Sequence, residues 1–476
     1  MSRRWIGYVM LAGITGLFQP DRSQAQTVCN RTGPDVIVGD LTGMGNFSVF
    51  SGRDALAFGT VSCNVGNVDL QWVEGTAAHP VIAQNLYKMK TVAGSVRFEQ
   101  IGMSWLKHGF FATSEELCCT NCVGVPDGSA LGVRCADTYD SFLNGFQPSL
   151  GPRWQVNAAT GVFTYPPANP AYSGTDTTAR RLQALTAELE PSAAGASYYG
   201  EGHYVSPDDA AAGNAYNNAS YRSITVSSSN GNWSFLFNAA LPTVREKSAI
   251  SAWKTVDPDV TETEVLIPGD GKLIVSSRAT ALGGGQWHYE YAVYNMNSDR
   301  SVGSVTVPLS AGTTVTNVGF HDVAYHDGDG PGNLNFSGAD WPAVVGCTEV
   351  AWSSEPYATN TSANAIRWAT LYNFRFDANV APAVAAAPIT LGLFKPGTPA
   401  SVMALAQVPG APTCACPGDV NGDGHANGAD VAVFARMYTG ALAIGPCANL
   451  APPACGALDA ADLAAFTAAI LTPSCP

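Results

Sequence analysis

The chain has 476 residues, of which 24 are Lys or Arg and 38 are Asp or Glu, giving a net charge of −14. Only 13% of the residues are charged and 46% are hydrophobic, whereas about 25% are charged in a typical soluble protein. This composition excludes a disordered polyelectrolyte. It also predicts no nucleic-acid partner, because phosphate binding needs clustered Lys and Arg. The 49 Gly and 30 Pro favour turns and short strands, so we expect a mainly β fold.

The N-terminus has the features of an export signal. Two arginines precede the apolar run 5–18, which is shorter than the roughly 20 residues needed to cross a bilayer. Ser23 and Ala25 stand at the −3 and −1 positions of a cleavage site. We therefore expect residues 1–25 to be a signal peptide of a secreted or cell-surface bacterial protein, with no membrane span in the mature chain. The arginine pair partly resembles a twin-arginine signal, and ordinary secretion is the preferred route.

Twelve cysteines in an exported chain favour disulfides over free thiols. Seven precede residue 408 and five follow it, so full pairing requires at least one disulfide between the two parts. Otherwise one thiol in each part stays free. The spacing of Cys118, Cys119, Cys122 and Cys135, with His108 nearby, also resembles a zinc site. In an exported protein, two disulfides are the preferred interpretation of these four residues.

The region 241–407 predicts a β-sandwich. Segments rich in β-branched and aromatic residues alternate there with Gly, Asn, Asp and Ser, as strand and turn sequences do. The expected strands are 272–281, 286–294, 301–308, 313–320 and 367–376.

The preceding region, 26–240, is also expected to be rich in strands. The expected strands are 35–41, 69–73, 96–101 and 220–226. Leucines at near-helical intervals in 177–189 are compatible with either a helix or a strand. The pattern leaves open whether 26–240 is a separate domain or half of a larger sandwich.

A short Pro- and Gly-containing linker, 408–413, precedes a small cysteine-containing module, 414–476. If residue 419 is position 1 of a 12-residue loop, oxygen-bearing side chains fall at positions 1, 3, 5, 9 and 12, and Gly falls at position 6. This is the pattern of a calcium loop, to which position 7 adds its backbone carbonyl. The candidate ligands are Asp419, Asn421, Asp423, His425, Asn427 and Asp430. A helix is expected directly after the loop.

The stretch GDVNGDGHANGADVAVFARMYTG resembles the first half of a type I dockerin. The resemblance implies a duplicated loop–helix module that binds calcium and docks onto a cohesin domain of a scaffold or a cell surface. Bacterial extracellular enzymes that degrade polysaccharides commonly carry such modules. In the second half, Ala451, Pro453 and Cys455 occupy the positions of ligands. We therefore expect a second helix at 462–471 but only one Ca²⁺ per chain.

Two clusters of the body contain acid–base side chains. One combines two carboxylates and an imidazole within eight residues, and paired carboxylates can hydrolyse glycosides. In the other, a His and a Glu share one face of the expected strand 286–294, and a further His follows on another strand. The catalytic candidates are Glu201, His203, Asp208, His288, Glu290 and His321. Surface pairs and hydrated turns explain the same residues without catalysis.

Two functions follow from this sequence. The preferred one is a secreted binding or surface protein, whose β-rich body is attached through the calcium-binding tail to a cohesin-like domain or another cell-surface component. The alternative is a secreted polysaccharide hydrolase that carries a dockerin. Polysaccharide is a candidate ligand in both, and Trp341 is the candidate for an exposed ring on which a sugar stacks. A third hypothesis is a metalloenzyme. It requires His203, His288 and His321 to lie close together in the folded chain.

Overall fold

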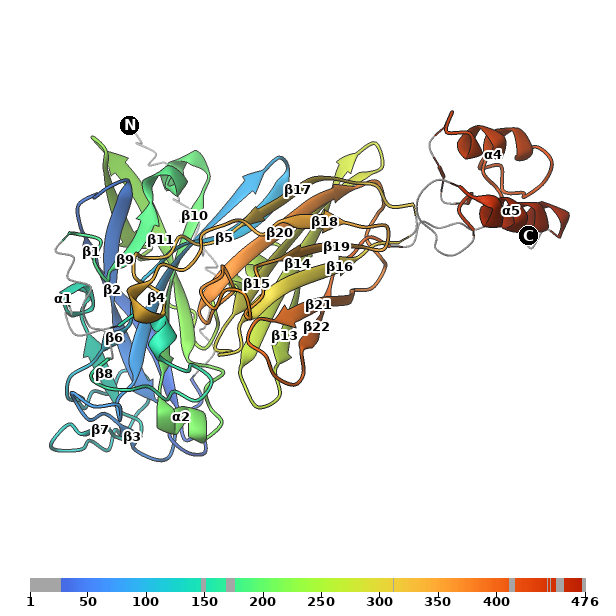
Figure 1. Ribbon diagram of the computed structural model, residues 1–476. Coiled ribbons are helices and arrows are strands. Elements are labelled where there is room, and N and C mark those ends of the chain that lie inside the picture. Colours follow the sequence, from blue (N-terminus) through green and yellow to red (C-terminus); the bar gives the residue numbers. More distant parts are fainter. Residues whose placement is uncertain are drawn as a thin grey trace, which may run out of the picture.

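The computed structural model describes residues 27–146, 151–167, 176–310, 312–410, 416–442, 444–445, 447–450 and 458–472. The expected signal peptide lies outside these residues. Strands dominate the described chain, which confirms the mainly β fold. Figure 1 shows two β-rich halves packed side by side, with two helices of the C-terminal tail standing apart from them. None of the helices in the described part of the chain combines the length and the apolar character needed to span a membrane.

The first half is built on one ten-stranded antiparallel sheet. Its strands are β1 (Val36–Asn46), β2 (Arg53–Asn64), β4 (Val81–Val92), β5 (Ser95–Met103), β6 (Lys107–His108), β8 (Ala136–Tyr139), β9 (Leu182–Leu185), β10 (Ser197–Val205), β11 (Ala219–Ser229) and β12 (Asn232–Phe237). The order is β1-β2-β9-β5-β4-β10-β11-β12, with β6 beside β4 and β8 beside β2. The sheet curls so that β1 also contacts β10, β11 and β12. A hydrophobic core that includes Val38, Phe58 and Tyr198 fills its interior.

Short elements complete this half. They are the strand pair β3 (Leu70–Gln71) and β7 (Ala130–Leu131), and the helices α1 (Ser141–Phe146) and α2 (Pro207–Ala211). The helix α3 (Ser251–Val256) follows this half and contacts strands of the second half. The ambiguous segment 177–189 forms the short strand β9 and then a 3-10 helix, Thr186–Glu188. Leu182 and Leu189 of this segment pack into the core, so tertiary burial explains the leucine spacing.

The second half is a β-sandwich, as predicted. One sheet has the order β13-β14-β15-β20-β17 and the other has the order β18-β19-β16-β21-β22. The strands of the first sheet are β13 (Thr261–Leu266), β14 (Lys272–Gly283), β15 (Gln286–Asn295), β17 (Val315–His321) and β20 (Thr370–Ala378). Those of the second are β16 (Val302–Pro308), β18 (Ala343–Val345), β19 (Glu349–Ser353), β21 (Ala387–Leu393) and β22 (Ser401–Ala406). Each of the five expected strands overlaps one of these elements.

The core of the sandwich follows the alternation of its strands. Tyr289 and Tyr291 point from β15 toward Trp352 of the facing sheet, and all three are almost completely buried. Trp341 belongs to the same core and is only 3% exposed. Its ring stacks on Phe320, with 5.8 Å between the ring centroids. The expectation that Trp341 is an exposed platform is therefore wrong, because the loop that carries it folds its ring between the sheets.

A third buried cluster joins the two halves. Tyr87 and Phe98 from the first half pack with Ile274 and Tyr294 from the second half, around Trp253 of α3. All five side chains are at most 3% exposed. Because apolar burial is the main favourable term in folding, this shared core fixes the two halves against each other.

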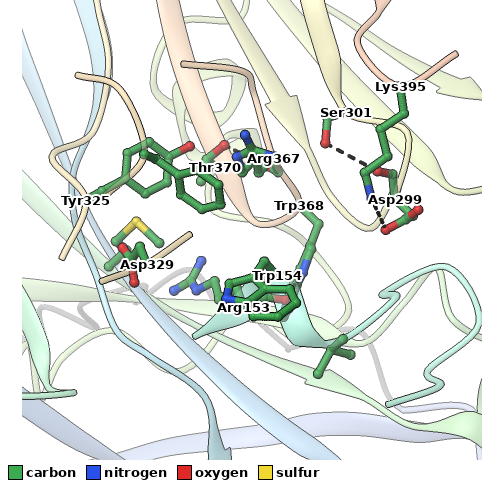
Figure 2. Close-up of a pocket in the computed structure, with 13 residues that line it drawn as sticks. Arg153, Trp154, Asp299, Ser301, Tyr325, Asp329, Arg367, Trp368, Thr370 and Lys395 are labelled. Carbon is green, nitrogen blue, oxygen red and sulfur yellow. Dashed lines mark hydrogen bonds and ion pairs between the residues drawn. The ribbon is translucent and has the colours of Figure 1, made fainter. Parts of the chain in front are cut away.

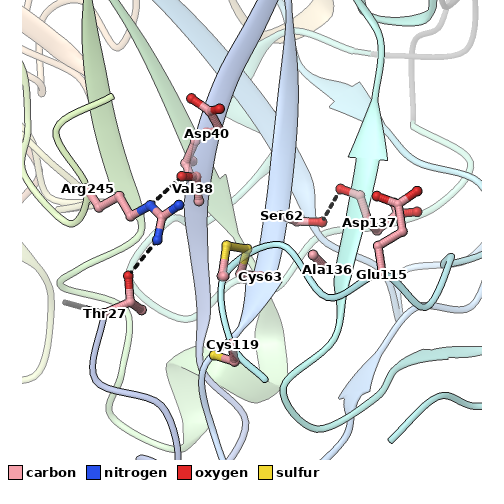
Figure 3. Close-up of a disulfide and its surroundings, with 12 residues drawn as sticks. Thr27, Val38, Asp40, Ser62, Cys63, Glu115, Cys119, Ala136, Asp137 and Arg245 are labelled. Atoms are coloured by element: carbon pink, nitrogen blue, oxygen red, sulfur yellow. Dashed lines mark hydrogen bonds between the residues drawn. A yellow bond between two sulfur atoms is a disulfide. The ribbon is translucent and has the colours of Figure 1, made fainter. Parts of the chain in front are cut away.

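Two disulfides fasten the loop between β6 and β8 to the rest of the first half, and a third closes a ring within that loop. They are Cys29–Cys119, Cys63–Cys118 and Cys122–Cys135. Figure 3 shows Cys63 and Cys119 beside β1 and β2, where Arg245 also holds the N-terminal segment through the hydroxyl of Thr27. The disulfide interpretation of these cysteines is confirmed, and the zinc interpretation is wrong.

Cys347, Cys416 and Cys447 are disulfide-bonded as well. The other six cysteines of the body pair among themselves, so the partner of Cys347 must be one of the five cysteines of the tail. A disulfide between body and tail therefore exists. It fastens the tail to the sandwich at the turn between β18 and β19, in addition to the connecting chain.

Candidate functional site

The tail places the loop 419–430 immediately before helix α4 (Val431–Tyr438). The carboxylate of Asp419 accepts backbone N–H groups from Gly422 and Gly424, at 2.7 and 2.8 Å. Gly424 has a φ of +89°, a conformation that side-chain-bearing residues rarely adopt. Glycine at loop position 6 therefore lets the chain fold back over the carboxylate at position 1.

Asp430 closes the loop from its other end. Its Oδ1 accepts the N–H groups of Val420 and Asn421, at 2.8 and 3.0 Å, and its Oδ2 accepts that of Asn427, at 2.9 Å. Asp430 is completely buried, whereas the other loop ligands except the half-buried Asp419 are exposed. The negative charge of Asp430 also lies at the N-terminus of α4, where the helix dipole favours it.

The candidate ligands of this loop are oxygen atoms, which hard cations prefer. Three carboxylates, two amide oxygens and one backbone carbonyl are oxygen ligands of the kind that Ca²⁺ prefers. Asn421 donates to Asp423 at 3.0 Å, so these two side chains lie next to each other. Among the described residues, no three His, Cys, Asp or Glu side chains are gathered closely enough to hold a metal by themselves. An ion at this loop would need its asparagines and its backbone as ligands as well.

The second half of the tail repeats the loop-closing contacts. Asp462 accepts the N–H of Leu450 through Oδ1 and that of Asp459 through Oδ2, at 2.9 and 3.0 Å. Helix α5 (Ala460–Leu471) follows, with Asp459 as its N-cap. Asp462 thus stands where Asp430 stands in the first half. The expected non-ligand residues 451, 453 and 455 lie outside the described residues.

The first catalytic cluster is divided between separate environments. Glu201 on β10 is completely buried and accepts hydrogen bonds from Asn85, Tyr87 and Tyr294, at 2.8, 3.0 and 2.8 Å. The N–H of Ala249 is a fourth donor, at 2.7 Å. Burial raises the pKa of Glu201 despite these donors. These contacts give Glu201 a structural role. It links the two halves, because Tyr294 lies on β15 of the sandwich whereas Asn85 and Tyr87 lie on β4 of the first half.

The other two residues of that cluster have their own neighbours. His203 is buried next to Trp368, with 6.0 Å between the ring centroids, and burial lowers its pKa to about 3. Asp208 lies in the first turn of α2 and accepts the backbone N–H of Gln71 at 2.7 Å. The structure therefore shows no contact that joins these three side chains.

Two residues of the second cluster, His288 and Glu290, do lie together, at the contact between the two halves. His288 on β15 lies between two carboxylates: its Nδ1 is 2.6 Å from Asp377 and its Nε2 is 3.0 Å from Glu290. Arg97 on β5 donates to the same oxygen of Glu290 at 3.0 Å. Burial by itself lowers the pKa of His288, but the hydrogen bonds to Glu290 and Asp377 and the charges of both outweigh it and raise the pKa. The expected pairing of His288 with Glu290 on one strand face is confirmed.

His321 has a different partner. Its Nε2 is 3.2 Å from Glu188, which follows β9 in the first half. No contact among the described residues joins His203, His288 and His321. The described residues therefore do not form the cluster of three histidines that the metalloenzyme hypothesis requires.

A cavity that no sequence pattern predicted lies between the two halves (Figure 2). Arg153, Trp154, Asp329, Arg367 and Trp368 are among its lining residues. They come from segments up to 215 residues apart in the chain, so no local pattern marks them. No family model matches this chain, and no curated protein sequence matches it.

Proposed function

We propose that the chain is a secreted modular bacterial protein whose tail binds one Ca²⁺ and attaches or displays a β-rich binding or surface body. The observation that carries the proposal is the loop 419–430. The carboxylates at its two ends, Asp419 and Asp430, are already turned inward by hydrogen bonds from the loop backbone. Such an arrangement lowers the cost of ordering the loop around an ion.

The bound ion would be held by the side-chain oxygens of five residues and by the backbone carbonyl of His425. The five residues are Asp419, Asn421, Asp423, Asn427 and Asp430. Calcium would supply the positive charge that balances three carboxylates within one 12-residue loop. Because Asp430 is also the residue before α4, ion binding and the position of this helix are coupled.

The helices of the tail support an attachment role. Val431 and Tyr438 on α4, and Leu463 and Leu471 on α5, are exposed apolar or aromatic side chains. Where such side chains form one contiguous patch, they mark a surface that binds a protein partner. A cohesin-like domain or another cell-surface component is the partner that we propose for this surface.

The test is a matched pair of isosteric variants in the full chain, Asp430→Asn and Asp462→Asn. Both replace an aspartate that closes a loop, but only Asp430 belongs to the complete set of ligands. Calorimetric titration is expected to show one Ca²⁺ per chain, with affinity reduced about tenfold or more by Asp430→Asn and unchanged by Asp462→Asn. No calcium binding by the wild-type chain, or equal affinity in both variants, would contradict the proposal.

A second assay of the full chain distinguishes a binding protein from the alternative, a polysaccharide hydrolase. Polysaccharides are incubated with the protein, and bound protein and released soluble sugar are measured in the same tubes. Binding without release supports a binding protein. Sugar release supports the hydrolase.

A further inference from the structure

An open groove lies in the loop between β6 and β7, at the end of the first half where Figure 1 shows β3 and β7. Its volume is about 570 Å³, within the roughly 300–1,000 Å³ of sites that bind small molecules. Two arms of this one loop line it, residues 111–114 and residues 124–128. Loops that a rigid scaffold holds in place are frequent carriers of binding residues.

The two arms are fixed to each other at the floor of the groove. The N–H of Ala112 donates to the carbonyl of Gly128 at 2.8 Å, and both residues are buried. Gly128 has a φ of +67°, and a Cβ there would lie 2.9 Å from the Cβ of Phe111. Glycine at this position therefore lets the arms approach closely. Two adjacent cysteines between the arms form disulfides with the rest of the first half, so little order has to be gained when a ligand binds.

Phe111 offers an aromatic ring at this groove. It is one of the lining residues and is 62% exposed. The face of an aromatic ring is apolar and carries partial negative charge, so it attracts the C–H groups on the face of a sugar ring. Trp341, the ring that the sequence suggested for this role, is buried in the sandwich core. Phe111 is thus a ring on the body that a sugar can reach.

Hydrogen-bonding groups stand beside this ring on the two arms. Asp127 is exposed, and its Oδ1 accepts the hydroxyl and the N–H of Ser129, at 2.7 and 3.1 Å. These contacts fix the carboxylate and leave its Oδ2 available to a ligand. Ser114 on the other arm is also exposed, and its hydroxyl makes no hydrogen bond within the described part of the chain. A carboxylate oxygen and a free hydroxyl suit the hydroxyl groups at the rim of a sugar.

The charge of the groove favours a ligand without negative charge. Among its nine lining residues, all of them in the described part of the chain, only Asp127 is ionisable. The hydrogen bonds from Ser129 lower the pKa of Asp127, so this carboxylate is charged at neutral pH. No Lys or Arg lines the groove to balance an acidic sugar, which Asp127 would repel.

We propose that this groove binds a segment of a neutral polysaccharide, with one sugar ring stacked on Phe111 and sugar hydroxyls bonded to Asp127 and Ser114. The proposal rests on the binding role proposed above for the body, and it names the ligand class and the site. The groove is open, so a chain longer than the groove can extend beyond it at either end. The site is independent of the calcium loop, which belongs to the tail.

The test is calorimetric titration of the full chain with hexasaccharides. The neutral probes are cellohexaose, xylohexaose and mannohexaose, and hexagalacturonate is the anionic probe. At least one neutral hexasaccharide is expected to bind, and hexagalacturonate is expected to bind at least about tenfold more weakly than that probe. Stronger binding of hexagalacturonate would contradict the assignment to a neutral sugar.

Phe111→Ala is the diagnostic variant. We expect it to weaken saccharide binding about tenfold or more, because the apolar face that the sugar covers is lost. Phe142→Ala is the matched control, since Phe142 is 65% exposed on α1 and does not line the groove. Both side chains are largely exposed, so both variants are expected to fold. Asp127→Asn, which keeps an acceptor for Ser129, should weaken saccharide binding and reduce the discrimination against hexagalacturonate.

Two results would overturn the proposal. One is that none of the three neutral hexasaccharides binds the folded wild-type chain, and the other is equal saccharide affinity in Phe111→Ala and Phe142→Ala. Calcium titration of the same samples separates this proposal from that for the tail. If Ca²⁺ binds but no neutral saccharide does, the groove proposal alone fails. If saccharide binding depends on Phe111 but Ca²⁺ does not bind, the groove proposal stands and the proposal for the tail fails.

Discussion

The rings of Phe434 and Phe466 stack face to face, with 3.9 Å between their centroids and 8° between their planes. Each phenylalanine stands four residues after the aspartate that closes its loop, Asp430 in one half and Asp462 in the other. The two side chains are therefore equivalent positions of a duplicated unit. They form the centre of the small core between α4 and α5.

This equivalence predicts that Phe434→Ala and Phe466→Ala have closely similar effects. Removing a buried phenylalanine costs about 3–5 kcal/mol, and a module of some 60 residues has little stability to spare. Either variant should abolish the unfolding transition of the tail in scanning calorimetry while the transition of the body remains. Leu463→Ala is the control, because Leu463 is 44% exposed on the same helix. A large difference between the two phenylalanine variants would contradict the equivalence.

The tail could be predicted from the sequence to this extent because its contacts are local. The loop spacing and the repeat alignment predicted both helices, and α4 and α5 follow as expected. The disulfide between Cys347 and the tail was one of two alternatives, because pairing depends on distances that spacing does not encode. Calcium binding and partner binding stay predictions.

The position of His288 between Glu290 and Asp377 predicts that the stability of the body depends on pH. Because the pKa of His288 is higher in the folded chain than in the unfolded chain, protonation favours folding. This contribution is complete below the unfolded pKa, about 6.5, and is lost as the pH rises through the folded pKa. We expect the free energy of unfolding to decrease over that interval, as measured by urea denaturation.

His288→Gln should remove this part of the pH dependence, because glutamine carries no charge at any pH. His425→Gln is the control, since His425 is exposed in the tail and has no carboxylate pair of this kind. If wild type and His288→Gln lose stability in parallel between pH 6 and 8, the assignment to His288 is wrong.

The environment of Glu201 depends on contacts between segments that are far apart in the sequence. Alternation along 286–294 predicted the contact of His288 with Glu290, because both residues lie on one strand. The donors to Glu201 come from three other segments, the nearest of them 48 residues away in the chain. The acidic cluster was visible in the sequence, but its burial depends on how the two halves pack. The burial of Trp341 is a consequence of tertiary packing in the same way.

Glu201→Gln is expected to destabilise the body, because the amide nitrogen would face donors that a carboxylate satisfies. Leaving buried donors unsatisfied costs about 1–3 kcal/mol, which denaturation in urea can resolve. A double-mutant cycle with Tyr294→Phe measures the contact between the halves directly. A coupling energy near zero would show that Glu201 does not link the sandwich to the first half.

The three disulfides predict a specific pattern of non-additive losses. Cys118 and Cys119 are adjacent, so Cys29–Cys119 and Cys63–Cys118 enclose largely the same chain, with separations of 90 and 55 residues. While one of them remains, removing the other opens an effective loop of only about 35 residues. Removing the second as well then opens the whole loop, which costs more.

Paired Cys→Ser variants test this pattern by urea denaturation of the body. From the dependence of loop entropy on length, losing Cys29–Cys119 should cost about 0.8 kcal/mol more when Cys63–Cys118 is already absent. Cys122–Cys135 closes a separate loop of 13 residues, so its loss should add independently of the other two. Equal costs for Cys29–Cys119 in both backgrounds would show that the disulfides act through contacts in the folded state rather than through the entropy of the unfolded chain.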